Sequence, residues 1–317
     1  MNIVKLPKGQ RLGQKVLNRE GFVMTIVKYR KNDDIDIEFE DGSMLYNKQY
    51  SNFIRGLYKK PLEARVGLTF TSHQGCVYKI ISILKENGVV RYLVEFQDDY
   101  KYKKVSDWRE CRKGSINNPY FKSIFNIGYL GVGIYDSKNS KSAYKSWYKM
   151  ISRCYNVNNE HYCAYGGRGV RVCDEWHNFQ NFAKWYYENS YPCIEGLEVD
   201  KDILKAKYYS PQTCLLIPSS INKLFIGIPN SINKNNPIGI TRKDSGNFTV
   251  YVSVEGKQKC FGTFDTIEEA ISIYKDKKEL NIKNSLIKYK NIIPSKIYDA
   301  IDNYSITLEI VEVIPTK

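Results

Sequence analysis

The sequence predicts a mixed α+β protein built from several small modules. Residues 1–64 and 65–120 repeat one pattern of alternating apolar and polar positions, which is typical of half-buried strands. Residues 197–225 read as two short strands, a connecting turn and a helix, and residues 237–274 read as three short strands before a helix. A chain of 317 residues usually forms more than one hydrophobic core, so two to four compact units are expected.

The two N-terminal repeats are expected to be small β-barrels of the Tudor type. Their clearest strands are expected at 22–27, 35–39, 76–80 and 92–96. In the first repeat, Asp41-Gly42 follows the second of these strands as a turn signal. Such barrels bind peptides, methylated side chains or nucleic acid, or only hold neighbouring modules in place, and the sequence does not choose among these roles.

The charge balance indicates a polyanionic partner. The chain has 48 Lys and Arg against 34 Asp and Glu, a formal net charge of +14. No apolar run approaches the roughly 18 residues that a membrane span needs, and the N-terminus lacks the apolar segment of a signal peptide. Eight cysteines without paired spacing read as reduced thiols. We therefore expect a cytoplasmic protein that binds nucleic acid and has no membrane partner.

The stretch 197–225 carries oxygen ligands that suit a divalent metal ion. Asp200 ends the first expected strand, and Asn222 lies in the helix that follows the second. Carboxylate and amide oxygens are hard ligands, which suit Mg²⁺ or Mn²⁺. Asp202 shares the strand face of Asp200 by the two-residue period, so it is a candidate second ligand or base. The other interpretation of Asp202 is a local cap of the turn.

This stretch resembles the ββα-metal core of HNH nucleases. The resemblance covers roughly residues 130–228, where the chain also reads YKSWYKMISRCYN and then YGGRGVRVCDEWHNFQNFAKWY. These runs are similar to a motif series of phage-type HNH homing endonucleases. The resemblance implies an HNH-like nuclease domain over residues 121–228, in which Asp200 and Asn222 hold the metal.

In that family, a histidine beside the metal-binding Asp activates the water, and an Asn orients the histidine. In this sequence the histidine position falls on Lys201 and the Asn position on Thr213. Lysine in water is protonated at neutral pH, so it accepts a proton only where its surroundings disfavour the charge. The candidate bases are therefore Lys201 in such surroundings, Asp202 or solvent, with His161 and His177 as further alternatives.

A glycine-rich turn lies between two helices expected near 144–155 and 176–187. It reads Tyr-Gly-Gly-Arg-Gly, and its Arg168 can bond a phosphate with two parallel hydrogen bonds. A tight turn without a ligand is the equal alternative. Five thiols lie in the same region, but none has the paired spacing of a structural zinc site, so zinc is not expected.

The run GTFDTIEEA, within residues 236–290, carries a second resemblance. It is similar to the APETALA2-type DNA-binding domain found in plant transcription factors and in phage HNH endonucleases. The resemblance implies a domain over residues 229–290 whose sheet enters the major groove. The DNA contacts it implies are Arg242, Lys243, Thr249, Tyr251, Ser253, Lys257 and Lys259. The arginine can read guanine, whereas the lysines are expected to meet phosphates.

The remaining residues join or extend these modules. Residues 229–236 read as a polar linker, and 291–317 as a C-terminal helix and tail. The tail contains a β-prone run, 305–313, which can add a strand to a neighbour.

Together these patterns predict a sequence-directed protein that binds double-stranded DNA. The first hypothesis is a Mg²⁺- or Mn²⁺-dependent homing or nicking endonuclease of phage origin, in the cytoplasm of a bacterial host. One alternative is an inactive nuclease-derived binder that acts as a phage regulator or anti-defence factor. The other is a scaffold whose N-terminal barrels hold a host or phage protein. Lys201 and Thr213 favour the alternatives, and Asp200 and Asn222 favour the enzyme.

Overall fold

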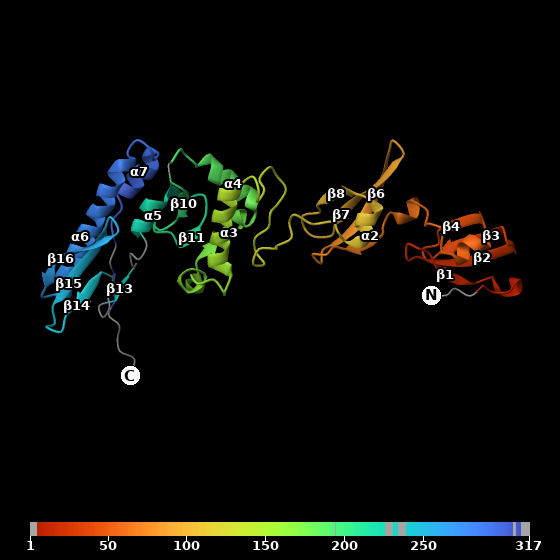
Figure 1. The fold of residues 1–317 in the computed structure, drawn as a ribbon, viewed down its shortest axis with the longest axis horizontal. Coiled ribbons are helices and arrows are strands. Elements are labelled where there is room, and N and C mark those ends of the chain that lie inside the picture. The colour runs from red at the N-terminus through yellow and green to blue at the C-terminus, as the bar shows by residue number, and fades with distance from the viewer. Residues whose placement is uncertain (1–4, 194, 226–230, 234–238, 307–308, 312–317) are drawn as a thin grey trace. The chain divides into compact units, whose positions relative to one another are not determined.

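The chain folds as several small sheets with helices packed on them, which confirms the mixed α+β class (Figure 1). The computed structural model describes residues 5–193, 195–225, 231–233, 239–306 and 309–311. Most of the predicted linker and the last residues of the tail lie outside this set. Contacts divide the chain into two compact units, Met1–Phe121 and Lys122–Lys317. No helix in the described part is long and apolar enough to cross a membrane.

The first repeat is a four-stranded antiparallel sheet. It contains, in spatial order, β1 (Lys15–Leu17), β2 (Val23–Lys31), β3 (Asp34–Phe39) and β4 (Met44–Lys48), followed by α1 (Tyr50–Ile54). Alternate residues of the central strands form the core, with Met24 and Ile26 opposite Phe39 and Ile37. Gly42 adopts φ 80° in the β3–β4 turn, a conformation that favours glycine. The predicted Asp-Gly turn is therefore confirmed.

The second repeat has the same strand order. It contains β5 (Thr69–Thr71), β6 (Val77–Glu86), β7 (Val89–Phe96) and β8 (Lys103–Ser106), followed by α2 (Trp108–Lys113). Its core again comes from alternate positions, including Tyr78 and Ile80 on β6 and Val94 and Phe96 on β7. In both repeats the sheet is an open meander, and no pairing among the described strands joins the first to the last. The predicted closure into barrels is therefore not detected there.

A buried ion pair joins the two sheets of the first unit. The Nη2 of Arg65 lies 3.1 Å from the Oε2 of Glu20, and the two side chains are 5% and 10% exposed. Trp108 Nε1 donates to Glu20 Oε1 at 3.0 Å, and the Arg65 guanidinium stacks 4.0 Å above the Trp108 ring. Arg65 Nη1 also donates to Tyr92 on β7. One carboxylate from the first repeat thus neutralises the buried cation of the second.

The N-terminal part of the second unit is a pair of helices, α3 (Lys141–Tyr155) and α4 (Phe179–Glu188). They enclose an aromatic core in which Trp147, Trp176 and Phe179 are fully buried. The indole nitrogen of Trp147 donates to the carbonyl of Trp176 at 2.7 Å, so this buried N–H has a hydrogen-bond acceptor.

The predicted strand–turn–strand–helix unit is present. It is formed by β10 (Leu197–Asp200), β12 (Leu215–Pro218) and α5 (Ser219–Phe225), and the two strands pair antiparallel. The connection between them carries an additional strand, β11 (Tyr208–Tyr209), which pairs parallel with β9 (Arg171–Val172). The sequence did not predict this pairing, because strands of two residues leave no periodicity to detect.

The three-stranded sheet and its helix are also present. The sheet order is β14 (Ile240–Arg242), β15 (Phe248–Val254) and β16 (Lys257–Phe264), and α6 (Ile267–Leu286) follows. The hydroxyl of Thr266 accepts from the amide of Glu269 at 3.3 Å and caps the helix.

Helix α6 belongs to two cores. Its first turns, with Ala270 and Tyr274, cover the three-stranded sheet. Its last turns, with Ile282 and Leu286, pack in one cluster with residues of α5 and of α7 (Ser295–Asp302). A single core therefore crosses the expected module boundaries at 228/229 and 290/291. The β-prone tail contributes β17 (Glu309–Val311), which pairs parallel with β13 (Ser231–Asn233).

Candidate functional site

Asp200, the first candidate metal ligand, is buried at the end of β10. Its side chain is 5% exposed, and its Oδ1 accepts a hydrogen bond from the amide of Ile203 at 2.8 Å. Burial raises the pKa of this carboxyl to about 6, because a charged carboxylate is poorly solvated there. The side chain therefore caps the turn that leaves the strand.

Lys201 stands at the position of the family's histidine, and it is engaged as a hydrogen-bond donor. Its Nζ donates to Oδ1 of Asp202 at 2.5 Å, with the Lys201 side chain 7% exposed and that of Asp202 52% exposed. The same Nζ lies 5.5 Å from the ring of Tyr165 and 5.7 Å from that of Tyr209. A carboxylate and aromatic faces are both favourable partners for an ammonium group. In this arrangement Nζ is a hydrogen-bond donor to Asp202.

A second cation shares these rings. The guanidinium of Arg153 lies 4.8 Å from the ring of Tyr165 and 5.9 Å from that of Tyr209, and its Nε is buried without a hydrogen-bond partner among the described residues. We call Arg153, Tyr165, Lys201 and Tyr209 the cation–aromatic cluster. Sequence reasoning missed three of its four members, because they come from separate segments with no spacing in common.

Asn222, the second candidate metal ligand, is engaged separately. Its Nδ2 donates to Oε2 of Glu198 at 2.5 Å, and no described contact joins Asn222 to Asp200. Glu198 lies two residues before Asp200, on the same strand face, and was not predicted as a site residue. Its spacing of two residues from Asp200 could have predicted it, because residues two apart on a strand share a face.

The oxygen donors around Asp200 fit a divalent metal poorly. One oxygen of Asp200 is used by the turn, the carboxylate of Asp202 is used by Lys201, and the amide of Asn222 is turned to Glu198. Among the described residues, no group of three or more His, Cys, Asp or Glu side chains could hold a metal ion. A Mg²⁺ or Mn²⁺ site would draw on the Asp200 and Asp202 oxygens that take part in these bonds, whereas the bond of Asn222 uses its amide nitrogen and not its oxygen.

The other candidate bases lie in local interactions. His177 Nδ1 lies 3.6 Å from Asp174 and its Nε2 lies 3.4 Å from the hydroxyl of Tyr155, and burial lowers its pKa. His161 is exposed beside Glu160. Thr213, at the position of the orienting Asn, donates its hydroxyl to the carbonyl of Tyr208 at 2.8 Å. It therefore stabilises a turn.

The glycine-rich turn packs against the end of α3. It forms the short helix η4 (Gly166–Arg168), and a Cβ on Gly166 would lie 2.2 Å from the carbonyl oxygen of Cys154. The first glycine is therefore required for close packing. Arg168 is exposed, and its side chain makes no hydrogen bond or ion pair with the described residues. It remains a candidate for a phosphate contact.

Gly166→Ala is expected to lower the free energy of unfolding by about 1–3 kcal/mol, because backbone atoms of α3 would have to move. Gly196→Ala is the matched control, since a Cβ there meets nothing within 4 Å. We expect the control to change stability by less than about 0.5 kcal/mol. Urea unfolding followed by tryptophan fluorescence measures both, and equal values for the two variants would contradict the packing role.

The predicted DNA contacts of the three-stranded sheet lie on two faces. Thr249, Tyr251 and Ser253 alternate on the face of β15 away from α6, and Thr249 is buried with its hydroxyl 3.0 Å from that of Thr263. Lys257 and Lys259 stand opposite Val254 and Val252, so they lie on the α6 side.

Two further positions lie at the end of β14 and in the turn after it. Arg242 stands opposite Phe248, 5.9 Å from its ring, and is also on the α6 side. Lys243 is exposed in the turn after that strand. The positions that the resemblance implies therefore lie on both faces of the sheet. A bulge in β16, with one extra residue near Gly262, shifts the register and places Lys257 and Lys259 on the face opposite to Tyr251.

Comparisons with known proteins return nothing that resembles this chain: no protein-family model, no curated protein and no solved structure matches it.

Proposed function

We propose that this protein binds duplex DNA through an HNH-like ββα unit that no longer hydrolyses it. The observation that carries the proposal is the state of Lys201. It occupies the position of the catalytic base, yet it is buried, donates to Asp202 at 2.5 Å and faces two tyrosine rings. A nitrogen in this arrangement has no free electron pair with which to activate water.

The charge supports binding as the remaining function. A formal net charge of +14 favours a polyanion, and exposed Arg168, Arg242 and Lys243 are available to phosphates. The two sheets of the first unit would act as modules that bind a host or phage protein. In this role the protein would be a regulator or an anti-defence factor, which acts by occupying DNA.

The homing or nicking endonuclease is the second candidate. What favours it is that Asp200 and Asn222 fall on the two metal-ligand positions of the family and carry oxygen atoms that suit Mg²⁺ or Mn²⁺. For that chemistry the bond from Ile203 to Asp200 and the pair formed by Lys201 and Asp202 would both have to open.

Binding and cleavage separate these functions. We expect the affinity for a labelled duplex, measured by fluorescence anisotropy, to fall on the order of 10³-fold between roughly 50 and 200 mM salt. Supercoiled plasmid, and phage and host genomic DNA, should stay uncut with Mg²⁺ or Mn²⁺. Arg168→Ala should lower the salt slope by about one phosphate contact, whereas Asp200→Asn should leave it unchanged.

Each other outcome has a definite meaning. Metal-dependent nicking that disappears in Asp200→Asn would contradict the proposal and establish the endonuclease. An affinity that does not depend on salt would contradict DNA binding through phosphates and favour the protein scaffold.

A further inference from the structure

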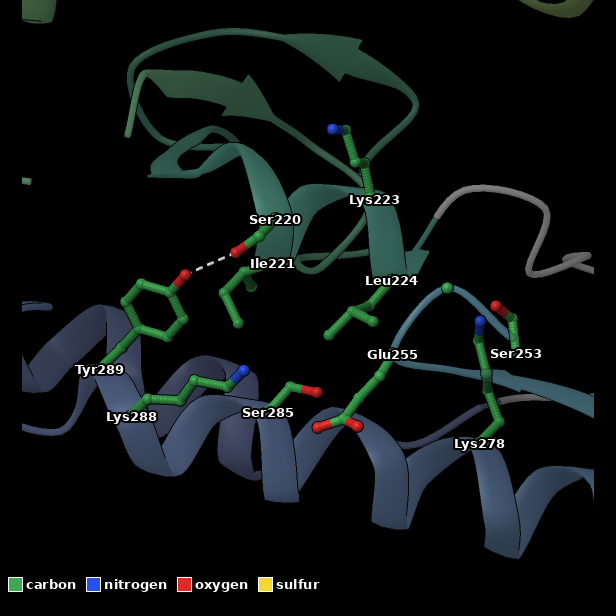
Figure 2. A pocket seen from close by; sticks show the side chains of 11 residues that line it. Ser220, Ile221, Lys223, Leu224, Ser253, Glu255, Lys278, Ser285, Lys288 and Tyr289 are labelled. Carbon is green, nitrogen blue, oxygen red and sulfur yellow. Dashed lines mark hydrogen bonds between the residues drawn. The ribbon is translucent and has the colours of Figure 1, made fainter. Parts of the chain in front are cut away.

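A pocket of about 300 Å³ lies between α5, the turn from β15 to β16, and the end of α6 with the short helix η6 (Ile287–Tyr289) (Figure 2). None of the candidate metal-site residues belongs to its lining, which contains several polar side chains. These include Lys223, Lys278, Lys288, Ser220, Ser285 and Tyr289. Glu255 is the one carboxylate of the lining, so Lys278 and Lys288 leave the pocket with an excess of positive charge.

Lys278 is the unusual member of the lining. Its side chain is only 8% exposed, and it makes no hydrogen bond or ion pair with the described residues. Burial lowers its pKa, because the ammonium has lost water and gained no carboxylate in return. An unpaired ammonium at this depth is unfavourable in the folded protein, and an anion in the pocket would offset that cost.

The opposite wall of the pocket is held in place. Ser220 and Tyr289 share a hydrogen bond at 2.6 Å between their hydroxyls, and both also bond to the carboxylate of Glu195. Figure 2 shows Ser285 and Lys288 projecting from the α6–η6 side toward α5, whereas the Lys223 side chain points away from α6. The helices α5 and α6, which line the pocket, share one hydrophobic core.

We propose that this pocket binds a phosphoryl group, with Lys278 as its central contact and Lys288 and Ser285 as further donors. A phosphoryl group carries up to two negative charges and several acceptor oxygens, which matches two ammonium groups and a hydroxyl. Lysine binds phosphate as a point charge, without a required orientation. The pocket exceeds the volume of one phosphate, so the group can be free phosphate or a phosphodiester of nucleic acid.

The test uses the full chain, inorganic phosphate as the probe, and Lys278→Met. Methionine keeps the apolar stem and removes the unpaired charge, so the variant is expected to fold at least as stably as the parent. Lys283→Met is the matched control, an exposed lysine on the same helix. Calorimetric titration at constant ionic strength should show phosphate binding by the parent and the control, and binding at least tenfold weaker by Lys278→Met.

A duplex titration then identifies the source of the phosphoryl group. A tenfold loss of duplex affinity in Lys278→Met but not in Lys283→Met assigns the pocket to the nucleic-acid backbone. Unchanged duplex affinity beside lost phosphate binding assigns it to free phosphate or a small phosphorylated ligand. Equal phosphate binding by parent and Lys278→Met, or none by the parent, overturns the proposal. The phosphate titration contains no DNA, so its failure is distinct from a failure of the proposed function.

Discussion

Asp200→Asn is expected to stabilise the second unit at neutral pH and to remove much of its pH dependence between about pH 4 and 6. Burial raises the pKa of this carboxyl from 3.8 to about 6. Below the unfolded value the carboxyl is neutral in both states, so its contribution to stability is fully present. As pH rises through the folded value, ionisation of the buried group costs up to about 3 kcal/mol.

Asparagine removes this ionisation and retains the structural bond. Its Oδ1 can still accept from the amide of Ile203, which the Asp200 carboxylate caps at 2.8 Å. Alanine would leave that amide unsatisfied, so Asp200→Ala is expected to be destabilising by about 1–3 kcal/mol. The two variants therefore separate the charge of Asp200 from its hydrogen bond.

Urea unfolding at about pH 4, 6 and 8, followed by tryptophan fluorescence, measures the effect. Three of the four tryptophans, Trp147, Trp176 and Trp185, lie in the second unit. The parent and Asp200→Asn should agree near pH 4 and diverge as the pH rises. Stabilisation of the parent alone by Mg²⁺ would make Asp200 a metal ligand and favour the endonuclease. A destabilised asparagine variant at pH 8 would contradict the expected cost of ionisation.

Glu20→Ala is expected to destabilise the first unit by about 3–5 kcal/mol. The substitution removes the carboxylate that neutralises Arg65, whose side chain is 5% exposed, and leaves Trp108 Nε1 without its acceptor. A buried cation without its partner costs far more than the pair contributes. Because the pair joins the two repeats, both sheets are expected to lose protection.

Hydrogen exchange of the full chain, resolved by peptide, distinguishes the sheets from the rest. Exchange should accelerate in β2, β3, β6 and β7 and stay unchanged in the second unit. Glu63→Ala is the matched control, because its pair with Lys85 spans 3.5 Å between side chains that are 77% and 58% exposed. We expect it to cost less than about 1 kcal/mol. Acceleration confined to the first sheet would show that the pair does not couple the repeats.

The sequence by itself determined the local elements of this protein. Alternation of apolar residues predicted the central strands of both repeats, and the Asp41-Gly42 signal predicted a turn. The strand–turn–strand–helix order of residues 197–225 also formed as expected. These features depend on residues within a few positions of one another, so the local sequence is enough to predict them.

Only the tertiary structure decided what surrounds the candidate site residues. The rings that face Lys201 come from Tyr165 and Tyr209, and the other cation from Arg153 on α3. One extra residue in β16 moved Lys257 and Lys259 to the opposite face from Tyr251. The charge state of a side chain depends on burial and partners, and its direction depends on register. Both are set by packing between distant segments, which sequence spacing does not encode.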